Sequence, residues 1–129
     1  MIKTLKSKGK NFMKINLKNE IIEYIMDKIG HSPEYLWEYS PSDAIFRSPK
    51  NRKWYALLMQ VKRKNLGLSG EDKANILNVK CSPATLDQLL FTKGFLPAYH
   101  MNKKHWITVL LDGSVEVENI HKLILTSLE

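Results

Sequence analysis

Residues 97–109 read PAYHMNKKHWITV and place two histidines, two lysines, a tyrosine and a tryptophan within thirteen positions. Residues 102–104 (NKK) form a polar interruption between apolar and aromatic residues. A polar turn between two β-prone segments predicts a β-hairpin, with arms Ala98–Met101 and His105–Leu111. We expect the rest of the chain to supply further strands and the helices that cover one sheet.

A second hairpin is expected upstream, with strands Ala44–Arg47 and Lys53–Lys62 joined by residues 48–51 (SPKN). Alternation in the longer strand predicts one face made of Tyr55, Leu57, Met59 and Val61 and another made of Trp54, Ala56 and Leu58. Because both faces are apolar, this strand is predicted to be central and at least partly covered on both sides.

Helical spacing of apolar residues predicts a first helix that begins at Asn16 as the N-cap and ends at Gly30. Its buried stripe would include Leu17, Ile21 and Ile25. Residues 1–15 precede it and are expected to form a basic, flexible tail. The single folded domain would therefore span residues 16–129.

Downstream, a strand is expected over Asn75–Cys81, after an exposed glycine-containing loop at residues 63–73. Ser82 as N-cap and Pro83 at the first helical position predict a short helix. Ser114 is expected to cap a final helix. The order of these elements predicts a two-layer α+β fold, with an antiparallel sheet and helices mainly on one face.

Length and composition set limits on the kind of protein. A chain of 129 residues suits one domain that buries a core without disulfides or a structural metal. No apolar run approaches the roughly 18 residues that span a bilayer, and the basic N-terminus lacks the apolar stretch of a secretory signal. The lone Cys81 agrees with a reducing compartment. We expect a cytoplasmic protein with no membrane partner.

The formal net charge of +7 is unevenly distributed. Six lysines precede the first acidic residue: Lys3, Lys6, Lys8, Lys10, Lys14 and Lys18. The remaining chain carries only +1, so the basic character is concentrated at the N-terminus. If translation starts at Met13, the net charge falls to +3. These lysines would act as an electrostatic arm or merely as a disordered start.

Three stretches resemble one known family. Residues 97–106 resemble the PGYHMNKKHW segment of the YjbR/MmcQ family, residues 77–83 (LNVKCSP) resemble its LNLKC-x-P element, and residues 44–59 (AIFRSPKNRKWYALLM) resemble its first hairpin. The resemblance covers most of residues 16–128. It implies a YjbR-like fold, related to the frataxin-like superfamily, with two projecting hairpin wings at residues 44–62 and 98–111. Members are usually described as DNA-binding proteins.

Three positions depart from the family's usual pattern. Ala98 stands where the family often has glycine, Ile107 where it often has asparagine and Ser82 where it often has aspartate. Serine still caps a helix. Ala98 argues against a required positive φ at that position, and Ile107 removes a polar group that could have faced a ligand. The binding surface is therefore expected to differ more than the fold.

The resemblance and the basic hairpins together suggest DNA as the partner, bound through its phosphate backbone with weak sequence preference. Aromatic and histidine side chains beside the lysines could add stacking and hydrogen bonds. The candidate residues are Arg47, Lys50, Arg52, Lys53, Lys62, Arg63, Lys64, Tyr99, His100, Asn102, Lys103, Lys104, His105 and Trp106. The alternative for the cationic residues is that they simply occupy solvated turns.

Two other functions stay open. The hairpin with Tyr99, His100 and Trp106 could form a surface for a protein partner or a small ligand, or its aromatic rings could simply anchor it to the core. An enzyme would need to pair Cys81 as nucleophile with His100 as base. No phosphate-binding loop, dinucleotide motif or nucleophile elbow is present.

A metal site would have to use His100 and His105 of one hairpin together with Cys81 or His31 elsewhere in the chain. Their spacing matches neither a helical HExxH pair nor the paired cysteines of a zinc ribbon. We therefore expect no metal, no cofactor and no catalytic step.

Overall fold

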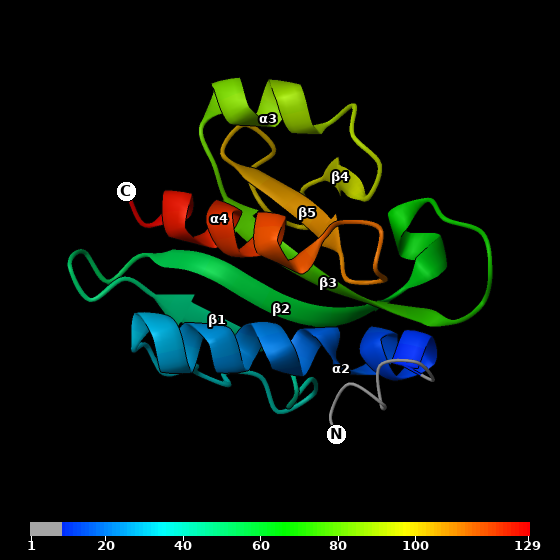
Figure 1. Cartoon of the computed structure of the whole chain (residues 1–129), viewed down its shortest axis with the longest axis horizontal. Coiled ribbons are helices and arrows are strands. Elements are labelled where there is room, and N and C mark those ends of the chain that lie inside the picture. The colour runs from blue at the N-terminus through cyan, green and yellow to red at the C-terminus, as the bar shows by residue number, and fades with distance from the viewer. Residues whose placement is uncertain (1–8) are drawn as a thin grey trace.

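The computed structural model of the chain describes residues 9–129, with side chains from Leu17 onward. Five strands form one sheet in the order β1-β2-β3-β5-β4, and all neighbouring strands are antiparallel (Figure 1). The strands are β1 (Ala44–Arg47), β2 (Trp54–Lys62), β3 (Lys73–Lys80), β4 (Phe95–Pro97) and β5 (Trp106–Leu110). The helical elements are α2 (Gly9–Tyr24), the π-helical turn η1 (Ile25–Ile29), the 3-10 turn η2 (Arg63–Leu66), α3 (Pro83–Leu89) and α4 (Val117–Ser127).

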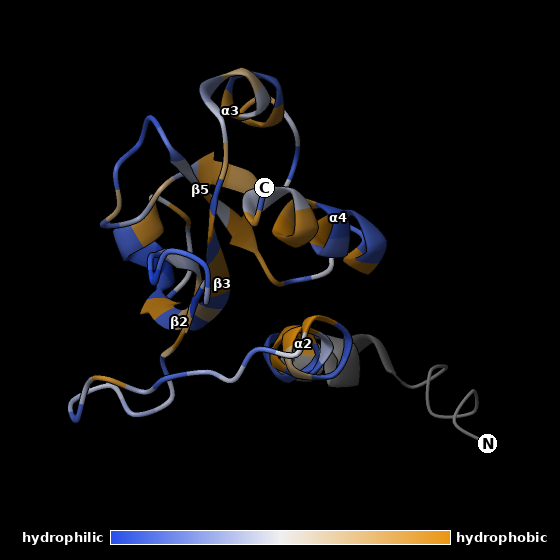
Figure 2. Cartoon of the chain, turned by 90° about the vertical axis from the view of Figure 1, so that its left-hand side faces the viewer, coloured by the Kyte–Doolittle hydropathy of each residue, from blue (hydrophilic) through white to orange (hydrophobic). Residues whose placement is uncertain are grey.

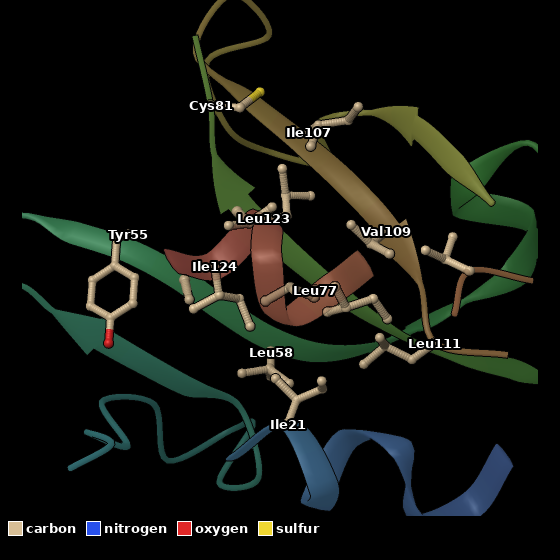
Figure 3. Packing of buried hydrophobic residues seen from close by; sticks show 14 of the residues in the cluster. Ile21, Tyr55, Leu58, Leu77, Cys81, Ile107, Val109, Leu111, Leu123 and Ile124 are labelled. Carbon is tan, nitrogen blue, oxygen red and sulfur yellow. The ribbon is translucent and has the colours of Figure 1, made fainter. Parts of the chain in front are cut away.

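Helices α2 and α4 cover the same face of the sheet (Figure 2). Alternate residues of the three central strands point toward them, because successive side chains of a strand lie on opposite faces. The resulting core includes Ile21 from α2, Leu58, Leu77 and Val109 from the sheet, and Leu123 and Ile124 from α4 (Figure 3). The predicted α+β class, with an antiparallel sheet and helices mainly on one face, is confirmed.

The opposite face of the sheet carries a smaller apolar cluster. Val61, Ile76 and Leu110 are buried there. Partly buried residues from the segment after β2, from β4 and from the segment after β4 pack against them, including Leu66, Leu68, Leu96 and Tyr99. Strand β2 is therefore covered on both faces, as its two apolar faces predict. The segment at residues 63–73 is mostly exposed, as expected, while its two leucines, Leu66 and Leu68, are partly buried against this cluster.

A β-bulge near the start of β2 changes which way two aromatic side chains point. Phe46 pairs with Ala56 and Arg47 pairs with Trp54, so Tyr55 is left without a partner in β1. Tyr55 joins the helix-side core, where its hydroxyl and His31 Nδ1 are hydrogen bonded at 2.7 Å. The ring of Trp54 contacts Trp37, with centroids 6.0 Å apart.

The predicted faces of β2 are therefore wrong at their first two residues. Tyr55 does not share a face with Leu57 and Met59, and Trp54 does not share one with Leu58. The physical reason is that one extra residue in a strand shifts the alternation of side chains by one position. From Ala56 to Val61 the alternation holds.

The starts of two helices also differ from expectation. Helix α2 already includes Gly9, so Asn16 does not start it. Helix α4 begins at Val117 with Glu116 in the N-cap position, so Ser114 lies before the helix, where its backbone N–H donates to Asp112 Oδ1 at 2.9 Å. Local hydrogen bonds of this kind compete with helix formation. The predicted tail over residues 1–15 overlaps α2 from Gly9 onward, and residues 1–8 lie outside the described part of the chain.

The second hairpin pairs β4 with β5, so its first arm is Phe95–Pro97 and not Ala98–Met101. Strand β3, predicted over Asn75–Cys81, spans Lys73–Lys80. Two helix boundaries were correctly predicted. The Ser82 side chain accepts a hydrogen bond from the Thr85 backbone N–H, with Pro83 at the start of α3. Gly30, with φ 86°, ends the first helical segment. Across residues 9–129, none of the helices combines the length and apolar character needed to cross a membrane.

Candidate nucleic-acid interface and a separate aromatic groove

The connection between β1 and β2 presents three cationic side chains to solvent. Lys50, Arg52 and Lys53 are all exposed. The turn is held by its own backbone and polar groups: Ser48 N–H donates to Lys53 O at 2.9 Å, and Lys53 N–H donates to Asn51 Oδ1 at 2.9 Å. Because these bonds satisfy the backbone, the charged side chains are left available to a partner in solution.

Arg47 has a different role from its neighbours in this hairpin. Its Nε donates to Glu34 Oε2 at 2.8 Å, and its Nη1 donates to the Arg52 carbonyl at 3.2 Å. The guanidinium also lies 5.9 Å from the Trp54 ring centroid. Two of its five N–H donors and one face of the guanidinium are thus engaged, so Arg47 braces the hairpin and is a weaker candidate for phosphate contact.

The turn before β5 lies at the same end of the sheet. The Cys81 backbone N–H donates to His105 O at 2.8 Å, which joins the end of β3 to the start of β5. Asn102 Oδ1 accepts from the Lys104 backbone N–H at 2.8 Å and so shapes the turn. Lys103, Lys104 and His105 are exposed.

A polar groove of about 570 Å³ runs between these segments. It brings together the β1–β2 turn, the end of β3, the start of β5 and the end of α4. Its charged and polar lining includes Ser48, Asn51, Lys53, Lys80, Ser82, His105, Thr126, Ser127 and Glu129. Lys80 was missed in the sequence, although its position directly before the Cys81-Ser82-Pro83 helix start could have identified it as a strand-end residue.

We call the set Lys50, Arg52, Lys53, Lys80, Lys103, Lys104 and His105 the basic end. Lys62, Arg63 and Lys64 do not belong to it. They follow the far end of β2, which at about 3.3 Å per residue lies roughly 30 Å from Lys53. The Arg63 Nε also donates to the Ser69 carbonyl at 2.6 Å. The predicted cations therefore form two separate groups.

A second groove, of about 420 Å³, lies on the sheet face opposite the helices. Its floor is formed by Leu57, Met59 and Val61 of β2, and its walls come from the segment before β1 and the segment after β4. We call it the aromatic groove; its lining is Trp37, Tyr39, Ser40, Asp43, Trp54, Leu57, Met59, Gln60, Val61, Tyr99, His100 and Met101. Of these, only Tyr99 and His100 were among the predicted site residues.

Two buried polar residues hold one wall of the aromatic groove in place. Asn78 and Thr108 are both 0% exposed. The Thr108 hydroxyl donates to Asn78 Oδ1 and accepts from the Tyr99 backbone N–H at 2.9 Å. Asn78 Nδ2 donates to the Tyr99 carbonyl at 3.0 Å. Both backbone groups of Tyr99 are thus fixed by the sheet.

His100 adopts the left-handed conformation, with φ 58°, and its ring stacks on Tyr99 with centroids 3.9 Å apart. A histidine rarely adopts this conformation without surrounding support, which the fixed Tyr99 backbone supplies here. Trp106, by contrast, is only 8% exposed and serves as a buried residue of β5.

The thiol and imidazole groups considered for catalysis line different grooves. Cys81 borders the polar groove and His100 borders the aromatic groove. Burial raises the pKa of the Cys81 thiol, which is opposite to the shift of an activated nucleophile. Within residues 9–129, no three His, Cys, Asp or Glu side chains are grouped as a metal site would require.

The molecule is thus a small α+β domain with an open antiparallel sheet, a basic end and an aromatic groove. The sequence model of the YjbR family, described as YjbR, matches residues 26–129. This chain belongs to the YjbR family, which confirms the resemblance noted in its three stretches of sequence.

Similar proteins come from several bacteria. The uncharacterised protein YyaQ of Bacillus subtilis (strain 168) is 40% identical over 107 residues, covering 83% of this chain and 91% of YyaQ. A crystal structure of a Pseudomonas syringae protein has a TM-score of 0.81 at 40% identity, covering 84% of this chain and 93% of that one. The Deinococcus radiodurans protein DR2400 has a TM-score of 0.56 at 25% identity, covering 75% of this chain and 64% of that one.

Proposed function

We propose that this protein binds DNA through the phosphate backbone, using the basic end. The observation that carries the proposal is the convergence of cations from three separate segments: the β1–β2 turn, the end of β3 and the turn before β5. Glu34, which lies beside the first hairpin, is already paired with Arg47. Glu129 borders the polar groove and is the acidic group that a phosphate would have to avoid.

Cations spaced along a surface neutralise phosphates and release counterions, which gives affinity without sequence recognition. Sequence recognition would need side chains presented as a rigid set to the base edges in a groove. The basic end consists of five lysines, one arginine and one histidine, most of them on turns, so it supports backbone contact in preference to base readout. We therefore expect similar affinities for duplexes of unrelated sequence.

The proposal is tested by fluorescence anisotropy of a labelled DNA duplex over a salt series. The variant K103E/K104E reverses two charges at the basic end. The matched control K62E/K64E makes the same change in net charge at the far end of β2. The basic-end variant should bind at least about tenfold more weakly, and the slope of log affinity against log salt should fall by about 0.9 for each phosphate that the variant no longer neutralises.

The N-terminal lysines require their own control. The variant K3Q/K6Q/K8Q/K10Q removes their charge while it leaves the length of the chain unchanged. If this variant abolishes binding and K103E/K104E does not, the folded domain is not the DNA site. Equal losses of affinity in K103E/K104E and K62E/K64E would show a response to net charge alone and would likewise contradict the proposal.

A further inference from the structure

The aromatic groove differs in charge from the rest of this basic protein. The side chains that line it include no lysine or arginine, and Asp43 is the one carboxylate among them. We propose that the aromatic groove binds a small organic ammonium cation. This inference does not rest on the proposed DNA binding, since it uses the sheet face opposite the helices and the opposite sign of charge; among the described residues, only Trp54 borders both grooves.

Asp43 supplies the negative charge. It is only 4% exposed, and its Oδ1 has no hydrogen-bond partner among the described residues. Such an acceptor is costly to leave unsatisfied inside a protein. A carboxylate shielded from water also attracts a nearby cation more strongly than an exposed one does, because the effective dielectric constant around it is lower.

Lys18 is a cation of this chain that interacts electrostatically with Asp43. Burial lowers the pKa of Lys18, and Coulomb attraction to Asp43 opposes part of that shift. Within the described part of the chain, however, the two side chains make neither a hydrogen bond nor an ion pair within 4.0 Å. Lys18 therefore attracts Asp43 from a distance but leaves its Oδ1 without a hydrogen-bond donor.

The aromatic rings supply the second element that an organic cation requires. An ammonium group is attracted to the electron-rich face of an indole or phenol ring. The rings of Trp37 and Trp54 are nearly perpendicular, at 89°, and form a corner of the groove. The Arg47 guanidinium already lies over the Trp54 ring, which shows that this indole accepts a cation in the folded protein.

The shape of the groove limits the ligand to a small molecule. Its volume of about 420 Å³ falls in the range of small-ligand sites. The floor of Leu57, Met59 and Val61 suits the carbon atoms of an alkylammonium compound, while Gln60 and Ser40 offer polar atoms at the rim. A phosphate or carboxylate ligand would meet Asp43 without a compensating cation in the lining. The chemistry therefore selects a positively charged ligand.

The test uses choline and its uncharged isostere 3,3-dimethylbutan-1-ol, with n-butylammonium as a second cationic probe. Binding to the full chain is measured by calorimetry and by intrinsic tryptophan fluorescence, in which Trp37 and Trp54 line the groove and Trp106 gives a background signal. We expect a Kd of about 10 mM or tighter for at least one cation, and binding at least about tenfold weaker for the isostere. The variant D43N should bind the cation about tenfold more weakly and bind the isostere with unchanged affinity.

The matched control is E38Q, which removes an exposed carboxylate from the same segment without touching the groove lining. It should bind both probes as the unaltered protein does. Circular dichroism tests whether D43N is folded. If D43N does not fold, W37L takes its place and should bind the cation at least about fivefold more weakly. Three results would overturn the proposal. Choline and its isostere could bind with equal affinity, D43N and E38Q could lose equal affinity for the cation, or neither cation could saturate the protein at about 100 mM.

Discussion

The rings of Tyr24 and His121 stack with their centroids 3.6 Å apart and their planes 7° from parallel, and so join helix α2 to helix α4. His121 Nε2 is buried and has no hydrogen-bond partner among the described residues. Burial lowers the pKa of His121, while Glu20 and Glu118 partly offset this effect by attraction. The contact between the two helices therefore favours a neutral imidazole.

This stacking predicts a pH-dependent stability. Above the ordinary histidine pKa of 6.5 both states are neutral and the contribution of His121 is fully present. Below pH 6.5 the unfolded chain takes up the proton first. The free energy of unfolding should therefore decrease as the pH is lowered, by at most about 1.4 kcal/mol per pH unit from this one group. Denaturation with urea between pH 8 and 5.5 measures the slope. His121→Phe keeps an aromatic ring and should show a shallower slope; identical slopes would contradict this prediction.

Gly94 and Gly113 form a matched pair for a second prediction. Both have positive φ, 93° and 92°, but a Cβ on Gly94 would lie 2.5 Å from Val115 Cγ2, whereas one on Gly113 would meet nothing within 4 Å. Gly113→Ala should lower the free energy of unfolding by about 1 kcal/mol through backbone strain alone. Gly94→Ala should cost about 1–3 kcal/mol more because of overpacking. Urea denaturation compares them, and equal destabilisation would show that Val115 moves aside freely.

The buried pair Asn78 and Thr108 leads to a third prediction. Thr108→Val preserves shape but leaves the Tyr99 N–H and Asn78 Oδ1 without that partner. The free energy of unfolding should fall by about 1–3 kcal/mol. The variant Thr92→Val, at an exposed site, should change it by no more than about 0.5 kcal/mol. Thermal and urea denaturation measure both variants, and a neutral Thr108→Val would mean that this hydroxyl contributes nothing net.

A fourth prediction concerns Cys81, the single cysteine of the chain. It is 7% exposed, and burial raises the pKa of its thiol. At pH 8 it should react with a disulfide reagent at least about tenfold more slowly in the folded protein than in guanidinium. The unfolded chain is the internal control, because every signal comes from one thiol. Equal rates would show that the site opens readily.

Much of the fold follows from local patterns in the sequence. The alternation from Ala56 to Val61 and the Ser82-Pro83 helix start predicted the right elements, because they depend on neighbouring residues only. The bulge at Tyr55 depends on register with β1, and no pattern within β2 reveals it. The burial of Asn78 and Thr108 also escaped prediction, since polar residues in a strand ordinarily face solvent.

Some residues of the candidate sites could likewise be predicted from local sequence and others could not. Cations on turns, such as Lys50 and Lys103, could be identified because turns expose their side chains. Asp43 and Trp37 were not recognised, because they reach the aromatic groove only when the segment before β1 folds back beside the sheet. The backbone bonds between Glu34 and Ile45, both 2.9 Å, fix that return.

The single extra residue in β2 decides on which face of the sheet each of two adjacent aromatic rings lies. With the bulge, Tyr55 enters the core beside His31 and Trp54 becomes a wall of the aromatic groove. Removing one residue at this point would restore strict alternation and exchange the two rings between the faces. The composition of the groove is thus encoded by a strand length as well as by residue types, because the register of β2 decides which of the two rings faces the groove.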